Sequence, residues 1–242
     1  MKNIEFSICL ACFNGEKYIK DQLISVLAQI GRDDEVVISD NGSSDRTLEI
    51  IESLHDERIK VLNCTTLGVV KNFQNCLVNA SGKYIVLCDQ DDVWLEGRLD
   101  AARCALYSSD LSVVGMLVVN EHLEPLELGS SFTYPSTSFF KTFYSNGFSG
   151  CCLAFRRNVL DIVLPFPDRL PMHDWWIVLM LILLKKNINI SENKFLLYRR
   201  HKNNVSNTAN NSKSTFLSKL YMRLLILFYL ILRYFKIIIL LK

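Results

Sequence analysis

Short apolar runs alternate with longer amphipathic segments over the first 90 residues. The apolar runs have the length of strands and the amphipathic segments the length of helices, so the pattern predicts strands and helices in alternation. In chain order these segments are Glu5–Ala11, Lys17–Gln29, Glu35–Ser39, Arg46–Leu54, Arg58–Leu62, Lys71–Ala80 and Lys83–Cys88. Strands joined by single helices form right-handed units, which predicts an α/β fold with a Rossmann-like, mainly parallel sheet and helices on both faces.

The alternation loosens beyond residue 110. Strand patterns recur at Leu111–Asn120, Phe148–Phe155 and Phe195–Tyr198, and an apolar helix is predicted from His173 to Lys186. Between them, the polar and aromatic segment Ser130–Tyr144 is typical of a loop over a binding site.

Polar side chains follow three of the predicted strands. Asn14 comes after the first strand, Asp40 after the second and Asp89 after the fourth. In open α/β sheets ligands bind beyond the carboxyl ends of the strands, so these residues mark a candidate site. The chain has neither a Gly-x-Gly-x-x-Gly sequence after its first strand nor a Gly-x-x-x-x-Gly-Lys-Ser/Thr sequence, which disfavours the usual dinucleotide and phosphate loops.

Composition refines this picture. The chain has 242 residues and 50% of them are hydrophobic, which excludes a disordered tail, a collagen-like rod and a small disulfide-linked domain. Residues 1–192 carry 17 basic and 25 acidic side chains, whereas residues 193–242 carry 10 basic and no acidic ones. The net charge of +2 therefore hides an acidic body and a basic C-terminal segment.

The eight cysteines are predicted to be free thiols in a reducing cytosol. Glu5 stands where a signal peptide would need its apolar run. Cys9 and Cys12 form a Cys-x-x-Cys sequence, but Cys9 lies inside a predicted strand, so both are interpreted as small buried side chains.

The segment Phe216–Lys242 is almost wholly hydrophobic, interrupted by Lys219, Arg223, Arg233 and Lys236. At 100° per residue these four side chains fall within an arc of about 140° on a helix. The nine residues between Arg223 and Arg233 are fewer than the roughly 20 that span a bilayer. We therefore expect a helix in an anionic membrane surface, with its basic side chains toward the headgroups. A core-packing helix and a span shared with another protein are the alternatives.

Asp89, Asp91 and Asp92 place three carboxylates within four residues. Such groups repel one another unless a cation lies among them, and Mg²⁺ binds one or two carboxylates together with phosphate oxygens of a substrate. In the alternative reading, Asp92 is the N-cap of a helix containing Trp94–Ala105 and the other two carboxylates are solvated.

Five motifs follow one another between residue 4 and about residue 207: Ser7–Gly15, Ser39–Asp45, Asp89–Trp94, His173–Trp176 and Tyr198–Ser206. Together they resemble the family 2 glycosyltransferases with the GT-A fold, and within them the rhamnosyltransferase-like branch that decorates bacterial surface polysaccharides. Each motif alone is weakly specific, and their shared order makes the resemblance strong.

The resemblance implies a site for a nucleotide-sugar. Asp40 would contact the base, Asp89 the ribose, and Asp91 would hold Mg²⁺ or Mn²⁺ against the diphosphate, with Asn14 in the same donor site. The family usually has two adjacent acids after the second strand, whereas Asn41 follows Asp40 here, so the identity of the base stays open.

The last motif contributes basic residues to this donor site. By the same resemblance, His201 would complete the metal shell or contact the diphosphate, and Arg199 and Arg200 would pair with phosphate oxygens. A solvated basic edge is the alternative.

The acceptor side comes from the second half of the chain. Asp174 is the candidate general base that takes the proton of the acceptor hydroxyl, although the local sequence equally allows a helix N-cap. Gly150 lies in a segment that resembles the family's acceptor wall. Trp94 and Trp175 are candidate platforms for sugar rings.

These observations predict a glycosyltransferase domain (1–207) with a membrane-associating tail (208–242). The enzyme would be inverting and metal-dependent, and would move a sugar, such as rhamnose, from a nucleoside diphosphate to a lipid-linked or surface-polysaccharide acceptor. It would lie peripherally on the cytoplasmic face of the plasma (inner) membrane and bind no nucleic acid. A non-catalytic glycan-binding or scaffold protein of the same fold is one alternative, and an Asp-x-Asp phosphotransferase with Asp89 as nucleophile is another.

Overall fold

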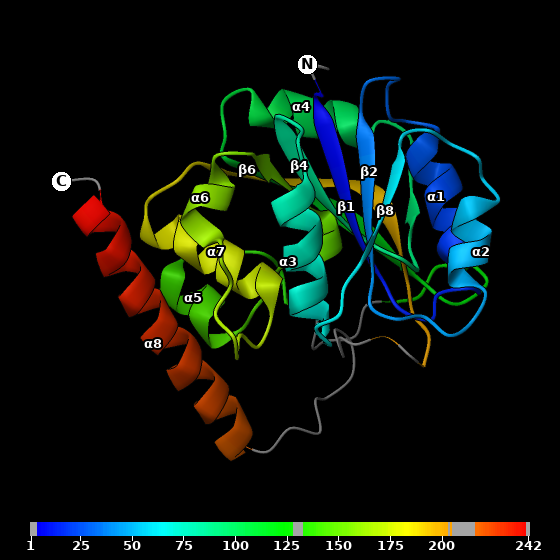
Figure 1. The fold of residues 1–242 in the computed structure, drawn as a ribbon. Helices are drawn as coiled ribbons and strands as arrows, with labels where there is room; N and C mark the ends of the chain where they lie inside the picture. Colours follow the sequence, from blue (N-terminus) through cyan, green and yellow to red (C-terminus); the bar gives the residue numbers. More distant parts are fainter. Residues whose placement is uncertain (1–3, 128–132, 203, 205–215, 241–242) are drawn as a thin grey trace.

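A mixed sheet of eight strands, in the order β3-β2-β1-β4-β7-β6-β8-β5, forms the centre of the protein (Figure 1). The computed structural model describes residues 4–127, 133–202, 204 and 216–240. In chain order the strands are β1 (Phe6–Cys12), β2 (Glu35–Asp40), β3 (Ile59–Asn63), β4 (Tyr84–Asp89), β5 (Val93–Trp94), β6 (Leu111–Val119), β7 (Leu153–Arg156) and β8 (Ile188–Arg199). The predicted domain boundary at residue 207 lies outside the described residues.

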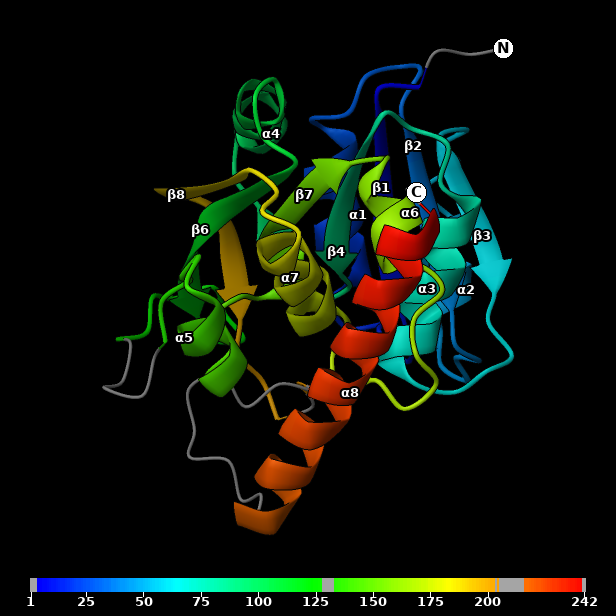
Figure 2. The same ribbon diagram turned by 90° about the vertical axis from the view of Figure 1, so that its left-hand side faces the viewer.

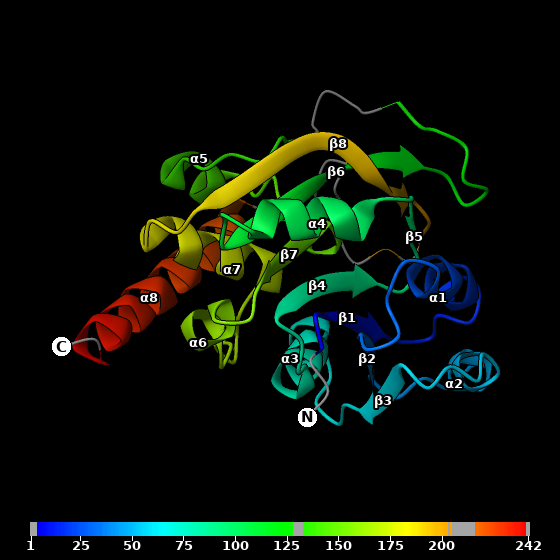
Figure 3. The same cartoon turned by 90° about the horizontal axis from the view of Figure 1, so that it is seen from above.

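Strands β1 to β4 form a parallel half, as the alternating pattern predicts. β1 pairs in parallel with β2 and β4, and β2 pairs in parallel with β3. The chain moves outward from β1 to β3 and then returns to β4. Right-handed connections therefore place α1 (Ile19–Leu27) and α2 (Thr47–Glu52) on one face and α3 (Val69–Asn79) on the other, as Figure 3 shows. Helices on both faces of the sheet are confirmed.

The second half of the sheet departs from the parallel pattern. β7 runs antiparallel to β4 and β6, β8 is parallel to β6, and β5 is antiparallel to β8. The strand predicted at Leu111–Asn120 is confirmed as β6. The one predicted at Phe148–Phe155 is confirmed in part, because Gly150–Cys152 forms a 3-10 helix, η1, before β7 begins.

The remaining helices are α4 (Arg98–Leu106), α5 (Phe139–Tyr144), α6 (Val159–Val163), α7 (His173–Leu183) and α8 (Phe216–Leu240). The helix predicted from His173 is confirmed as α7, whose residues 173–181 are all buried.

Two local predictions are wrong. The segment predicted to be a loop from residue 130 contains helix α5, whose Phe139 and Phe143 rings stack 5.8 Å apart and whose Phe143 ring lies 6.3 Å from that of Trp175. Packing of these aromatic side chains against α7 overrides the polar character of the segment. Asp92 is not a helix N-cap, because α4 begins at residue 98; its Oδ1 accepts a hydrogen bond from the Arg199 backbone at 3.0 Å.

Helix α8 packs along α5, α7 and α6 (Figures 1 and 2). Its Ile226 and Leu230 are buried in the main core. Arg223 donates to the carbonyl of Tyr144 at the end of α5, at 2.6 Å, and Arg233 donates to carbonyls at the end of α6, one of them at 2.7 Å. The expectation that these two arginines reach lipid headgroups is therefore wrong, because their guanidinium groups fasten α8 to the C-terminal ends of two helices of the body.

The opposite face of α8 is apolar and solvent-exposed. Its exposed large side chains are Leu217, Leu220, Tyr221, Leu224, Phe228, Ile231, Leu232, Phe235 and Ile239. Among the helices that the structure describes, none combines the length and the apolar character needed to cross a bilayer. Three of its basic residues, Lys219, Arg223 and Arg233, lie toward the protein, Lys236 is exposed, and the outer face of the helix is hydrophobic.

Candidate active site

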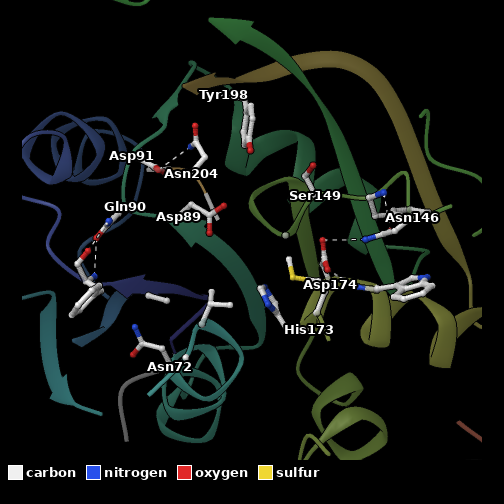
Figure 4. Close-up of a pocket in the computed structure, with 18 of the residues that line it drawn as sticks. Asn72, Asp89, Gln90, Asp91, Asn146, Ser149, His173, Asp174, Tyr198 and Asn204 are labelled. Carbon is white, nitrogen blue, oxygen red and sulfur yellow. Dashed lines mark hydrogen bonds between the residues drawn. The ribbon is translucent and has the colours of Figure 1, made fainter. Parts of the chain in front are cut away.

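A cavity of about 1410 Å³ lies at the carboxyl ends of the parallel strands, where the sheet topology predicts a ligand site. Asn14 follows β1, and Asp89 and Asp91 lie at the end of β4 and just beyond it. Asp174 of α7 and His201, after β8, come from the second half of the chain. Figure 4 shows Asp89 and Asp91 on one side of this space and Asp174 on the other.

Asp91 and His201 form one side of the cavity together. Asp91 Oδ2 lies 2.7 Å from His201 Nε2 and accepts a hydrogen bond from Asn204 Nδ2 at 3.3 Å (Figure 4). The His201 ring stacks on Tyr18 with centroids 4.7 Å apart. A carboxylate oxygen beside an imidazole nitrogen is a donor set that suits Mn²⁺ and accepts Mg²⁺. The structure therefore brings together the two residues predicted to hold the metal.

The centre of the cavity holds a group of carboxylates that repel one another. The pKa of Asp89 is raised to about 7, first by burial and then by the negative charges of Asp91 and Asp174. Carboxylates that raise one another's pKa in this way attract a cation and repel a bare diphosphate. A divalent ion beside Asp91 would remove this repulsion.

Asp89 also belongs to a second group of possible metal ligands. The ligand atoms of Asp89, Asp92 and Cys151 are all within 4.8 Å of one another. Asp92 is fully buried. The hydrogen bond with Cys152, then burial and the neighbouring carboxylates, raise the pKa of the Cys151 thiol, which keeps it protonated. A protonated thiol and a carboxylate without access to solvent fit Mg²⁺ or Mn²⁺ less well than Asp91 and His201 do, because these ions keep water or phosphate oxygens in their shells.

Asp174 lies in the first turn of α7, with Met172 at the N-cap position, so the alternative reading of Asp174 as the cap is not supported. Its Oδ1 accepts a hydrogen bond from the Trp175 backbone at 2.6 Å, and its Oδ2 accepts one from Asn146 at 3.4 Å. Burial raises the pKa of Asp174 to about 6. A carboxylate with this pKa is ionised at neutral pH and is a stronger base than an exposed aspartate.

Gly150 and Trp175 lie on the same wall as Asp174, as predicted for the acceptor side. Trp175 donates from Nε1 to the carbonyl of Thr142 at 2.8 Å. A Cβ atom at Gly150 would lie 2.9 Å from His173 Nε2, so this position requires glycine.

His173 is a cavity residue to which the sequence analysis gave no role. Its ring stacks on Phe73 with centroids 4.1 Å apart, and desolvation lowers its pKa to about 3, so the imidazole is neutral. Within the described part of the chain, neither ring nitrogen has a hydrogen-bond partner. Its position beside Asp174 in the fourth motif was the one sequence feature that could have marked His173 as a site residue. That position does not predict its burial.

Asn14 and Gln90 shape the loops around the donor side. Asn14 Oδ1 accepts a hydrogen bond from the Ser44 backbone at 2.8 Å, and the Asn14 backbone donates to Ser43 Oγ at 2.9 Å. Gln90 holds the backbone of Phe13 through two hydrogen bonds, of 2.9 and 3.1 Å. Asn14 thus lines the cavity as predicted, and Gln90, which was not singled out, fixes the loop beside it.

Asp40 is placed differently from the prediction. Its Oδ2 accepts hydrogen bonds from the backbones of Gly42 and Ser43 at 3.0 and 2.9 Å, which closes its own turn, and it is not among the residues that line the cavity. Asn41 lines the cavity instead, and its Oδ1 accepts a hydrogen bond from the Gly68 backbone at 2.9 Å. The predicted contact between Asp40 and the base is therefore not supported.

Three further predicted residues do not line the cavity. Trp94 is only 4% exposed and lies under the Arg98 guanidinium, so it offers no platform to a sugar. Arg199 is buried, and its Nη2 lies 3.2 Å from Asp21. Arg200 donates its backbone N–H to the end of β6. The predicted contact of Arg199 with the diphosphate is not supported, since its guanidinium is buried and paired with Asp21. The predicted role of Arg200 stays a prediction.

A mixed α/β sheet with carboxylates in a cavity beyond β1 and β4 is the arrangement expected of a GT-A glycosyltransferase. The sequence model of glycosyl transferase family 2 matches residues 7–163, and the chain belongs to this family. The matched span contains Asn14, Asp89 and Asp91 and ends before Asp174 and His201. Family membership sets aside the phosphotransferase and the non-catalytic alternatives.

Individual relatives support this classification. The chain is 25% identical to the dTDP-rhamnosyl transferase RfbG of Shigella flexneri over 210 residues, covering 81% of the chain and 72% of the relative. It is 29% identical over 189 residues to the UDP-Glc:alpha-D-GlcNAc-diphosphoundecaprenol beta-1,3-glucosyltransferase WfgD of Escherichia coli, covering 76% of the chain and 71% of the relative.

A solved structure has the same fold. TarS 1-349 of S. aureus in complex with UDP-GlcNAc superposes with a TM-score of 0.71 at 23% identity, over 92% of this chain. The matched region is 66% of the TarS chain, so this protein spans slightly less than two thirds of it.

Proposed function

We propose that the protein is a metal-dependent, inverting glycosyltransferase that moves a sugar from a nucleoside diphosphate to a lipid-linked or surface-polysaccharide acceptor. One observation carries the proposal: a buried carboxylate with a raised pKa, Asp174, lines the same cavity as Asp91 and His201, whose side chains lie 2.7 Å apart. A sugar between them has a base on one side and a site for its leaving group on the other.

Asp174 acts as the general base. The acceptor hydroxyl attacks the anomeric carbon as the Asp174 carboxylate takes its proton, and the bond to the diphosphate breaks on the opposite face of the sugar. Direct displacement of this kind inverts the anomeric centre, by the same logic as in inverting glycosidases. Asn146, bonded to Oδ2 at 3.4 Å, orients the carboxylate.

Asp91 and His201 hold the divalent cation, and Asn204 orients the Asp91 carboxylate. When bound, the cation neutralises negative charge on the departing diphosphate. On the donor side, the Asn14 side-chain amide can donate to the nucleotide. The Asn41 amide shapes the wall, because it is bonded to the backbones of Cys64, Thr66 and Gly68. The departing nucleoside diphosphate is already ionised, so no second protein acid is needed.

The names of two relatives support a choice of donor and acceptor. One carries a dTDP-rhamnosyl transferase name, and another is named for UDP-glucose and a diphosphoundecaprenol-linked acceptor. We therefore assign a nucleotide-activated hexose, with rhamnose as the first candidate, and a lipid-linked glycan as the acceptor.

The exposed face of α8 supports a position at a membrane. Nine large apolar side chains along one helix face exceed what a monomer usually leaves in water, and a lipid-linked acceptor requires the enzyme to work at a bilayer. The face carries no charged group, so its burial in the interface costs no charge desolvation. The protein is thus peripheral, on the cytoplasmic leaflet where nucleotide-sugars are present.

Replacing Leu224 and Phe228 together by serine should reduce co-sedimentation with phospholipid vesicles by at least about tenfold, since each buried apolar side chain contributes roughly 1.5–3 kcal/mol. Donor binding should not change, because both side chains point away from the cavity. Ile226→Ala, on the docked face of α8, is the matched control; it should lower thermal stability and leave vesicle binding intact. Unchanged vesicle binding of the double variant would contradict the membrane assignment.

A thermal-shift panel of nucleotide-sugars, with and without Mg²⁺ or Mn²⁺, tests the proposed function directly. We expect one nucleotide-sugar to raise the melting temperature only when metal is present, because the acidic cavity repels a bare diphosphate. Equal stabilisation without metal would remove the metal from the proposal. If no nucleotide-sugar stabilised the protein under any condition, the assignment of a donor site would fail.

A further inference from the structure

Helix α8 contributes side chains to the cavity as well as a surface to the exterior. Lys219, Met222 and Arg223 are the α8 residues, within the described part of the chain, that line it. Lys219 and Arg223 are four positions apart and therefore share one face of the helix. The first turns of α8 thus bring two cations to an otherwise acidic cavity.

Contacts of Arg223 place this pair on the base side of the cavity. Arg223 Nη2 donates to the Tyr144 carbonyl at 2.6 Å, and its guanidinium lies 4.6 Å from the centroid of the Tyr144 ring. Two residues further along the chain, Asn146 donates to Asp174. The two cations therefore lie next to the wall that carries the general base, whereas Asp91 lies across the cavity from Asp174 (Figure 4), with His201 2.7 Å from it.

The charges of Lys219 and Arg223 are not neutralised by neighbouring carboxylates. Another cavity lysine, Lys17, forms an ion pair with Glu121. In the part of the chain that the structure describes, neither Lys219 nor Arg223 takes part in an ion pair. Arg223 uses one guanidinium nitrogen for Tyr144 and retains further N–H donors. Two unpaired cations at a cavity wall form a site for an anion.

An apolar surface begins directly beside this site. Leu217, Leu220, Tyr221 and Leu224 belong to the same turns of α8 and are exposed. A ligand that combines an anionic group with a long apolar chain matches both features, because its anion meets Lys219 and Arg223 while its chain follows the outer face of α8.

We propose that Lys219 and Arg223 form a subsite for the phosphate group of a lipid-linked acceptor. The inference rests on the proposed function and adds the acceptor's anchoring group to it: the phosphate is held at α8, the lipid lies along the exposed apolar face, and the saccharide reaches inward to Asp174. This subsite is separate from the donor diphosphate site at Asp91 and His201.

Calorimetric titration of the full chain with farnesyl diphosphate tests the subsite. Nonionic detergent and EDTA are present, so that no metal can hold the diphosphate at Asp91. We expect Lys219→Gln to weaken binding about tenfold, the loss expected for one charge-assisted hydrogen bond, and to leave binding of farnesol unchanged. Lys236→Gln, which removes an exposed charge from the same helix, is the matched control and should bind farnesyl diphosphate like the wild type.

Three outcomes would overturn the subsite. Lys219→Gln could bind farnesyl diphosphate normally, or Lys236→Gln could weaken binding equally, which would indicate general attraction to a basic helix. Lys219→Gln could also lose affinity only for phosphatidylcholine vesicles containing phosphatidylglycerol, which would assign Lys219 to bulk lipid headgroups. None of these results bears on donor binding with Mn²⁺, so failure of the subsite and failure of the proposed function are distinguishable.

Discussion

Asp174→Asn is expected to lower kcat by about 10²–10⁴-fold, the range for removal of a general base. Donor binding in the presence of metal should stay near the wild-type value, because Asp174 lies across the cavity from Asp91 and His201. Transfer assays and nucleotide titrations on the same preparation measure the two quantities. Asp168→Asn, which removes an exposed carboxylate paired with Lys71, is the control and should be fully active. Loss of nucleotide binding in Asp174→Asn would remove Asp174 from the role of base.

The pH profile of the wild type reports on the same group. Burial raises the pKa of Asp174 to about 6, and only the ionised form accepts a proton. The value of kcat/KM should therefore fall about tenfold per pH unit below 6 and level off above about 7. The residual activity of Asp174→Asn should lack this transition.

Asp174→Asn should also be more stable than the wild type at neutral pH. The pKa of this carboxyl is higher in the folded protein than the ordinary value of 3.8, so the folded state loses stability as pH rises from about 4 to 6 and the buried group ionises. Asparagine avoids this cost, which amounts to at most about 3 kcal/mol. The melting temperature of the variant should exceed that of the wild type by several degrees at pH 8, and the two should converge near pH 4.

The second large effect is expected at Asp91. Asp91→Asn should weaken metal-dependent nucleotide binding about 100-fold, because a divalent ion beside a diphosphate contributes several kcal/mol and an amide replaces the anionic ligand poorly. The variant should fold normally, since asparagine can still accept the hydrogen bond from Asn204. Titration of nucleotide at several Mn²⁺ concentrations provides the measurement.

Asp92→Asn is the matched control, because it changes a neighbouring carboxylate of the same motif. Its asparagine can keep the hydrogen bond from the Arg199 backbone, and its side chain does not line the cavity. We expect metal-dependent binding to persist. The reverse result, loss in Asp92→Asn and retention in Asp91→Asn, would move the metal to the group formed by Asp89, Asp92 and Cys151.

The parallel half of the fold could be predicted because three of its four strands, β1, β2 and β4, are buried on both faces. The apolar runs of β1 and β4 and the amphipathic helices between strands carry a clear periodic signal. The second half carried a weaker signal. The antiparallel direction of β7 and the helical turns of α5 and η1 depend on tertiary packing, such as Phe143 near Trp175, which no local pattern encodes.

At the site, the sequence predicted which strand ends surround the cavity, but it did not predict the direction of each side chain. Asp91 and His201 meet as expected from their motifs. Asp40 and Arg199 occupy equally plausible positions, yet Asp40 accepts hydrogen bonds from the backbone of its own turn, and the buried Arg199 pairs with the exposed Asp21 of α1. Side-chain direction at a strand end follows from the final turn of the backbone, which the periodic pattern does not determine.

The sequence also predicted that the basic residues of α8 gather on one side of a helix. That arrangement was correct, but these residues were expected to face lipid. Two helix C-termini of the body, on α5 and α6, present unpaired carbonyls to Arg223 and Arg233. The arginines satisfy these carbonyls, which have no partner within their own helices.

Fastening α8 at two arginines has a geometric consequence for the acceptor. Because the two arginines hold α8 to α5 and α6, a bilayer seated on its outer face would stand at one height relative to Asp174. The length of glycan between lipid and reacting hydroxyl then becomes a selection criterion. An acceptor with too few sugars falls short of the base, and one with too many overshoots it. The docked helix would thus set the acceptor length that reaches Asp174, so that the enzyme adds its sugar at one step of a growing chain.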